Sequence, residues 1–362
     1  MKKSLIAIAA LAAVGAASAQ SSVTLYGLAD TGLAYKTEKT KVDGVTANKH
    51  STFRATTGTL NGSRLGVKGA EDLGNGLKAT FNYELGFDSA NGSFNANNGG
   101  VEGFGRKATV GLAGNFGHVR IGRDNTVVDN LVTATSADAQ STVDTAGRAH
   151  GRTTTTDMVT DRANGVHYDG NFSGVAVSAF VAPSGANTQG DTFYDEEKTN
   201  TVGPSVKKRN LGYGLSVGYA NGPLTAGVAA QQFTYKDTVA GSKETETQAA
   251  VGGAYDFNVA KVYANYIYNR TKDTGAGVTT KGPKAHEANL GVTVPFGAAS
   301  FVAEYGYNRY KENDSKARNS HDFMVGANYA FSKRTDVYGR IGYRGLLKAS
   351  DSGISGNQQT YA

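Results

Sequence analysis

The feature that most constrains this chain is an alternation of apolar and polar residues with a period of two. From Leu77 to Phe87 every odd position is apolar and every even position is polar or Gly. The same alternation holds in Val23–Tyr35 and in Thr335–Arg344. Successive side chains of a β-strand point to opposite faces, so each segment predicts a strand with one apolar and one polar face. We find no comparable helical spacing.

This alternation predicts fifteen strands and the start of a sixteenth. The strands span residues 22–35, 62–71, 77–87, 106–114, 118–124, 164–170, 174–183, 210–220, 224–237, 245–256, 260–271, 286–295, 298–311, 319–331 and 335–346, with the sixteenth beginning at Thr360. Seven short turns alternate with eight longer polar loops, the third of which covers roughly residues 125–163. The spacing predicts an antiparallel sheet with both termini at the end that carries the short turns.

Short turns at one end and long loops at the other are typical of bacterial outer-membrane barrels. A sheet can cross hydrocarbon only if it closes on itself, because lipid offers no hydrogen bonds to an open edge. Five of the short turns carry an aromatic side chain, as an interfacial girdle requires: Phe116, Phe172, Phe257, Phe296 and Phe331. We therefore predict an all-β fold, a 16-stranded antiparallel transmembrane β-barrel wide enough for an aqueous channel. Hairpin packing in a soluble sandwich is the alternative.

The composition fits such a barrel and excludes several chemistries. The chain has 362 residues, of which 48 are Gly and only 39% are hydrophobic, as expected when half of each strand faces water. It contains no Cys, which excludes disulfides, thiolate metal sites and thiol nucleophiles. The six His have no metal-ligand spacing, and we find no nucleophile elbow, Walker loop or dinucleotide fingerprint. We expect no catalytic residue, metal or cofactor; a loop pair of His150 with Asp144 is the remaining enzymatic alternative.

Residues 1–19 have the pattern of a secretory signal peptide. Lys2 and Lys3 precede a short apolar run, and Ala17–Ala19 has the small-x-small pattern of a cleavage site. The run is too short to cross ~30 Å of hydrocarbon. We predict cleavage after Ala19, which leaves residues 20–362 as the barrel and places it outside the cytoplasm.

Strand parity assigns most charged side chains to the water-facing side of the wall. Arg64 and Lys68 lie opposite Leu65 and Val67, which have the lipid-facing parity. A charge on the lipid face at mid-membrane costs up to ~2–4 kcal/mol, so the water-facing side is strongly favoured. The same parity places further charges in the lumen, and the third loop adds more: Lys78, Glu84, Lys107 and Arg120 from the strands, and Asp129, Asp138 and Arg162 among the loop charges.

Five segments carry patterns whose order and spacing are specific in combination. They are Ser22–Asp30, Ser63–Ala79, Val110–Gly117, Arg120–Arg123 and Phe331–Tyr338. Together they resemble the trimeric porins of Gram-negative bacteria, in particular the betaproteobacterial branch with anion-preferring members, over nearly the whole mature chain. The resemblance implies a homotrimer of sixteen-strand barrels in the outer membrane, passive diffusion of small hydrophilic solutes, and a third loop folded inward to narrow each pore.

The same resemblance implies a set of constriction residues. The pore arginines of anion-preferring members correspond to Arg64, to Arg106 or Lys107, and to Arg162, facing an acidic residue at Glu84. Strand parity favours Lys107 as the pore residue. A bulge at the strand end would instead point Arg106 into the pore, so both remain candidates. The complete predicted pore lining is Arg64, Lys68, Glu84, Arg106, Lys107, Arg120, Arg162, Asp129 and Asp138. Fixed cations across from carboxylates in a narrow passage predict a mild anion preference.

The sequence departs from this family at its end. Members finish with a full strand and a C-terminal aromatic residue, whereas this sequence ends Tyr361–Ala362, so we expect the last strand to be incomplete. The net charge of +6 fits either anion preference or contact with anionic lipopolysaccharide. The expected partners are two further copies of the chain, outer-membrane lipid and lipopolysaccharide, and small hydrophilic solutes and anions, without nucleic acid. The competing functions are a substrate-selective channel or an adhesin on the same barrel.

Overall fold

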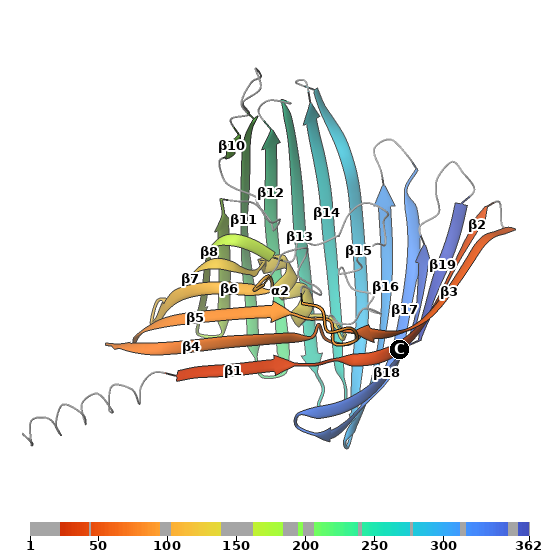
Figure 1. Cartoon of the computed structure of the whole chain (residues 1–362), viewed down its shortest axis with the longest axis horizontal. Coiled ribbons are helices and arrows are strands. Elements are labelled where there is room, and N and C mark those ends of the chain that lie inside the picture. Colours follow the sequence, from red (N-terminus) through yellow and green to blue (C-terminus); the bar gives the residue numbers. More distant parts are fainter. Residues whose placement is uncertain are drawn as a thin grey trace, which may run out of the picture.

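The computed structural model describes residues 22–42, 45–94, 103–138, 162–183, 195–197, 206–237, 241–275, 278–311, 316–346 and 354–361. In this part of the chain, one 19-stranded antiparallel sheet surrounds one helix (Figure 1). The elements are β1 (Ser22–Leu28), β2 (Thr31–Val42), β3 (Val45–Thr57), β4 (Arg64–Gly74), β5 (Leu77–Gly86), β6 (Lys107–Gly114), β7 (Gly117–Asn125), α2 (Val127–Ala134), β8 (Arg162–Phe172), β9 (Val175–Ala182), β10 (Asp195–Glu197), β11 (Val206–Asn221), β12 (Leu224–Asp237), β13 (Ser242–Asp256), β14 (Lys261–Gly275), β15 (Val278–Phe296), β16 (Ala299–Lys311), β17 (Arg318–Ser332), β18 (Thr335–Leu346) and β19 (Ile354–Tyr361).

These strands build a wall of sixteen, as the alternation predicts. β1 continues into β2 through Ala29 and Asp30, and β3 continues into β4. The two long strands pair throughout, because β1 pairs with β4 and β2 pairs with β3. The short β10 pairs with one end of β11. Nineteen strands, less these two continuations and β10, leave the sixteen of the predicted barrel.

The pairing runs from strand to strand around the wall and returns to its start. β9 pairs with β11, and the last strand, β19, pairs with both β18 and β2. β19 contacts only the upper part of β18, from Ile341 to Leu346. Below it, the Tyr338 hydroxyl of β18 donates a hydrogen bond to Asp30 at the junction of β1 and β2. One short strand above and one side-chain bond below thus join the two ends of the sheet.

All seven predicted turns are present, but several predicted loops are partly strand. Residues 36–61 form most of β2 and β3, and residues 272–285 form the adjoining ends of β14 and β15. The last strand begins at Ile354, not at Thr360. Beyond the level of the membrane an outward side chain need not be apolar, as Thr279 and Lys281 of β15 illustrate. The alternation therefore ends before the strand pairing does.

The side chains are distributed inside out relative to a soluble protein. Large apolar residues cover the outer surface, where Leu25 is 73% and Phe296 is 77% exposed. Polar residues such as Gln248 and Glu287 are buried on the inner face. This arrangement confirms the two-faced strands that the sequence predicts. None of the helical segments in the described part of the chain has the length and hydropathy needed to cross a membrane.

The third loop folds into the barrel, as the resemblance implies. It leaves β7 at Asn125, and α2 packs against β9, β11, β12 and β13 (Figure 1). Val128 and Val132 are buried in an apolar cluster with Phe233 on the inner wall. The helix corrects our expectation that no helical spacing exists. With only eight residues, its apolar face is too short to stand out in the sequence.

Candidate pore constriction

A carboxylate held between two elements marks the centre of the candidate constriction. Glu84 faces inward on β5 and is only 5% exposed. Its Oε1 lies 2.7 Å from Nε of Arg106, which directly precedes β6. The Arg106 backbone N–H also donates to the Glu84 carbonyl at 3.1 Å. On the other side, the Tyr26 hydroxyl lies 3.0 Å from Glu84 Oε2 and 2.8 Å from Asn82 Oδ1. These contacts fix the carboxylate and its guanidinium partner in place.

Two further arginines adjoin this pair. Arg162, the first residue of β8, is buried and donates from Nε to the Arg106 carbonyl at 3.0 Å. Arg64 begins β4, and it forms no ion pair with any residue that the structure describes. Burial and the charge of Arg162 lower the pKa of the Arg106 guanidinium, with a smaller contribution from Arg64, while the bond to Glu84 opposes the shift. Arg64 and Arg162 thus add positive charge beside the ion pair of Glu84 with Arg106.

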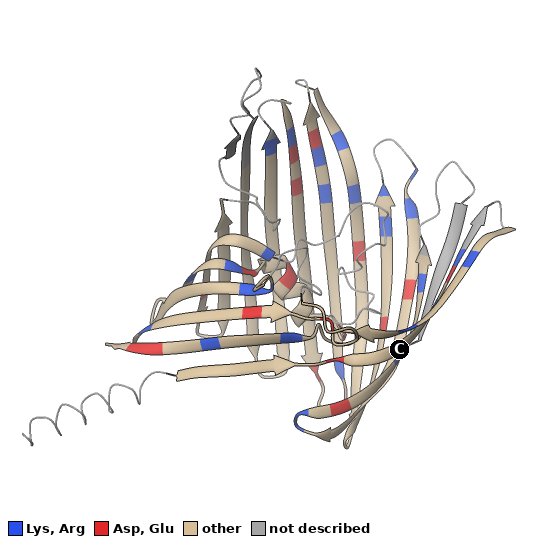
Figure 2. Ribbon diagram, viewed as in Figure 1, with Lys and Arg blue, Asp and Glu red and all other residues tan. Residues whose placement is uncertain are grey.

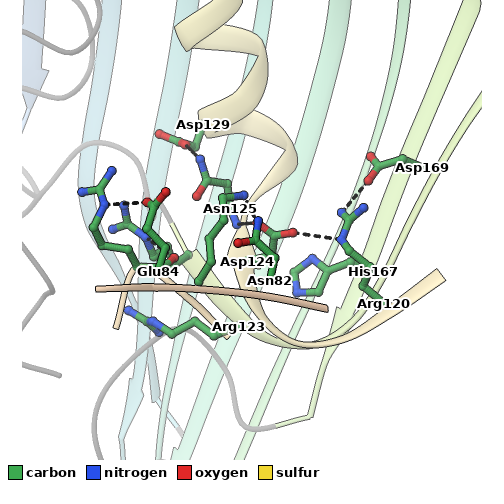
Figure 3. A network of polar contacts seen from close by, with 12 residues as sticks. Asn82, Glu84, Arg120, Arg123, Asp124, Asn125, Asp129, His167 and Asp169 are labelled. Atoms are coloured by element: carbon green, nitrogen blue, oxygen red, sulfur yellow. Dashed lines mark hydrogen bonds and ion pairs between the residues drawn. The ribbon is translucent and has the colours of Figure 1, made fainter. Parts of the chain in front are cut away.

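A second network of charges lies beside the first and is balanced (Figure 3). Lys107 faces inward on β6 and pairs with Asp124 of β7. Arg120 pairs with two carboxylates. Its Nε lies 2.9 Å from Asp124 Oδ2, and its Nη2 pairs with Asp169. Together with His118 and other side chains, these groups line a cavity of about 300 Å³. Arg106 and Lys107, the two candidates for one position, thus both face the lumen but serve different carboxylates.

The remaining predicted residues occupy other positions. Lys68 is exposed on β4, with its Nζ 5.3 Å from the centre of the Tyr26 ring. Asp129 is only 1% exposed within α2 and accepts a hydrogen bond from Asn125 Nδ2 at 2.9 Å (Figure 3). This position favours a role in holding the loop. Asp138 ends the described part of the loop and pairs with Arg340 of β18, whose Nε and Nη2 lie at 2.8 and 3.2 Å.

The inner face of the opposite wall is shaped to receive the loop. The backbone N–H groups of Ala137 and Asp138 donate to Glu304 of β16 at 3.1 and 3.3 Å. Two inward glycines lie directly beneath the loop. A Cβ on Gly252 would meet Thr135 Oγ1 at 2.4 Å, and a Cβ on Gly291 would meet the Ala137 Cβ at 2.7 Å. Larger residues at these positions would displace the loop toward the lumen.

We did not predict Asp124, Glu304 and Arg340 as site residues. A signal for each is present, because all three share the inward parity of their strands: Asp124 with Arg120, Glu304 with Asn308, and Arg340 with Tyr338. Parity shows that these groups face the lumen. It does not show which of them a loop from the far side of the barrel will reach.

A protein family, curated relatives and solved structures all match this chain over most of its length. A family model described as Gram-negative porin matches residues 5–346. Outer membrane porin protein 32 of Delftia acidovorans is 35% identical, over 99% of this chain and 93% of that protein. An outer membrane porin of Bordetella pertussis is 32% identical, over 93% of each. Among solved structures, the anion-selective porin from Comamonas acidovorans superimposes with a TM-score of 0.69 at 27% identity, covering 94% of this chain and 98% of that one.

Proposed function

Because this chain belongs to the family of Gram-negative porins, we propose that Arg64, Arg106 and Arg162 give its channel a preference for anions. The protein is an outer-membrane porin whose wall encloses a water-filled path for passive diffusion of small hydrophilic solutes and ions. Its action is transport through a channel and not catalysis.

The observation that carries the selectivity is the gathering of three arginines around Glu84. In the neighbouring network Lys107 and Arg120 are matched by Asp124 and Asp169, so it contributes little net field. Around Glu84, Arg106 pairs with the carboxylate, whereas Arg64 pairs with no carboxylate that the structure describes, so positive charge remains. Fixed charge in a narrow passage with low-dielectric walls concentrates counter-ions and excludes ions of like charge. Anions should therefore cross faster than cations, and the similar porin from Comamonas acidovorans is itself anion-selective.

We also propose that three copies assemble through the outer face of β1 and β4–β7. This face carries an apolar hollow of about 570 Å³, lined by residues that include Val23, Phe81, Val110, Leu112 and Ile121. A second copy of the chain, which presents the same apolar face, is the occupant that fits.

The mature protein begins at Gln20 in this proposal, after removal of residues 1–19.

The inward tyrosines favour general diffusion over a sugar-selective path. Tyr26 and Tyr338 both face the lumen, but the Tyr26 hydroxyl is held by Glu84 and the Tyr338 hydroxyl by Asp30. An aromatic path for sugars needs ring faces that are free to stack on a passing solute. Here a cation already lies over each ring, with Lys68 Nζ 5.3 Å from the centre of the Tyr26 ring and Arg340 Cζ 5.6 Å from the centre of the Tyr338 ring.

Planar-bilayer recordings of the purified protein test this function. The expected result is an ohmic current that rises in groups of three equal steps, one group per trimer. Currents that saturate with solute concentration and are blocked by a particular sugar would favour a substrate-selective channel. Insertion without any conductance would overturn the proposed channel.

A further inference from the structure

We propose that the outer face of β14, β15 and β16, at its extracellular end, binds the phosphate groups of lipopolysaccharide. We base this on the proposed function, since the end of the barrel with long loops must face the cell exterior for this surface to meet the outer leaflet. The lipid would be held by Lys284, Arg309 and Lys311 through its phosphates, and by the apolar wall below them through its acyl chains.

The first observation is a row of like charges on neighbouring strands. In the strand register, Arg270 lies opposite Lys284, and Lys284 lies opposite Lys311. Paired strands are ~4.8 Å apart, and like charges directly opposite each other destabilise a sheet. One step lower, Arg309 lies opposite His286. The upper ends of these strands carry bands of positive residues in Figure 2.

These cations point away from the lumen. The residues that alternate with them, Ala285 and Tyr310, are buried on the inner face. Lys284, Arg309 and Lys311 form no ion pair with a carboxylate in the part of the chain that the structure describes. Within the described residues, these three cations are therefore available to an anion from outside the protein.

The second observation is a hollow with an aromatic floor at the same place. A cavity of about 490 Å³ lies between these strands, and its lining includes Tyr266, Lys284, His286, Tyr307, Arg309 and Lys311. Glu287 also adjoins it, but this residue is fully buried and has the inward parity of β15. The Tyr266 hydroxyl lies 2.5 Å from His286 Nδ1. The Lys284 ammonium lies 5.5 Å from the centre of the Tyr268 ring. The aromatic groups hold the floor of the hollow, and the cations stand around its rim.

The third observation is the height of the hollow on the wall. On β15, His286 lies ten residues above the girdle residue Phe296. At ~3.3 Å per residue and a tilt of ~40°, ten residues rise about 25 Å, which is the height of the apolar band of such barrels. The outward residues between them are all apolar: Ala288, Leu290, Val292 and Val294. The cations therefore lie at the level of the lipid headgroups, above a surface suited to acyl chains. A free phosphate would make no contact with that apolar surface.

A nearby surface offers a matched control. Lys236 of β12 lies opposite Lys243 of β13, which is also a pair of like charges near the extracellular end. The outward residues directly below them are polar on both strands, namely Thr245 and Thr247 on β13 and Thr234 and Gln232 on β12. These lysines therefore lack the adjoining apolar surface on which acyl chains could pack, and they should not hold a lipid.

Binding of defined lipids to the purified trimer, followed by native mass spectrometry, tests the site. The test variant combines Lys284→Gln, Arg309→Gln and Lys311→Gln, and the control combines Lys236→Gln and Lys243→Gln. Wild type and control should bind bis-phosphorylated lipid A equally, and the test variant at least about tenfold more weakly. The wild-type protein should bind dephosphorylated lipid A no more tightly than the test variant does. Equal binding of phosphorylated lipid A by the test variant, or its displacement by an equal concentration of inorganic phosphate, would overturn the proposal.

Two controls separate this site from the channel and from misfolding. The substituted side chains face outward, so the conductance of the test variant should equal that of wild type. If the wild-type protein conducts ions but binds phosphorylated and dephosphorylated lipid A equally, the lipid site alone is refuted. If the wild-type protein does not conduct ions, the proposed function is refuted. A second variant with Lys284→Arg and Lys311→Arg keeps the charges and should retain the lipid; loss of binding there would contradict the electrostatic origin of the site.

Discussion

The two sides of this barrel differ in strand length and in what they present to the lumen. The strands β4–β9 have 8–11 residues, and the strands β11–β17 have 13–19. The short wall carries the arginines around Glu84 and the balanced network beside them. The tall wall carries the glycines, the apolar cluster and Glu304, which hold the third loop. The short wall thus supplies the electric field in the pore, and the tall wall positions the loop that narrows the pore. Substitutions on each wall should change these two properties separately.

The largest effect should come from neutralising the short wall. A variant with Arg64→Gln, Arg106→Gln and Arg162→Gln removes the excess positive charge, so the anion-to-cation permeability ratio should fall by about tenfold. Reversal potentials in a salt gradient measure this ratio. The outward variant Lys311→Gln serves as the control and should leave the ratio unchanged. If the triple variant keeps the wild-type ratio, the short wall is not the source of the field.

The next effect should come from crowding the tall wall. Gly252→Val places a side chain where Thr135 now lies, which should push the loop into the lumen and lower single-channel conductance. Overpacking of this kind should also reduce the free energy of unfolding by about 1–3 kcal/mol, measured by urea denaturation. The adjacent Gly253→Val is the matched control, because its nearest neighbour would be a backbone oxygen at 3.3 Å. Equal conductance in the two variants would show that the wall does not position the loop.

A smaller effect should follow from loosening the end of the described loop segment. Asp138→Asn removes the ion pair with Arg340, and we expect a local loss of about 1–3 kcal/mol. The loop should then fluctuate, which should appear as added current noise at an unchanged permeability ratio. Asp336→Asn, exposed on the same strand as Arg340, provides the comparison. Noise that rises equally in both variants would argue against this anchor.

The smallest effect should come from the balanced network of the short wall. Lys107→Gln leaves Arg120 to pair with Asp124 and changes the net charge by one, against three in the arginine variant. We expect the permeability ratio to change by less than about twofold, since a nearby cation still screens the carboxylate. A change as large as that of the arginine variant would mean that the two charge networks act as one.

The wall of this protein is more predictable from its sequence than the contacts inside it. Each strand meets lipid on one side and water on the other, so the alternation records its position directly, as in Leu77–Phe87. The rule fails where both sides meet water, which is why β3 and the first residues of β15 are missed. It also fails where partners are remote, since nothing near Asp138 in the sequence points to Arg340. Arg106 lies one position before its strand, and its contact with Glu84 depends on the geometry of that strand end.

The central claim is that Arg64, Arg106 and Arg162 on the short wall make this channel prefer anions. The most direct test is the zero-current potential of the wild-type protein in an uncharged planar bilayer between two concentrations of potassium chloride. We predict the sign that corresponds to chloride crossing faster than potassium. A potential of zero, or of the opposite sign, would contradict this account.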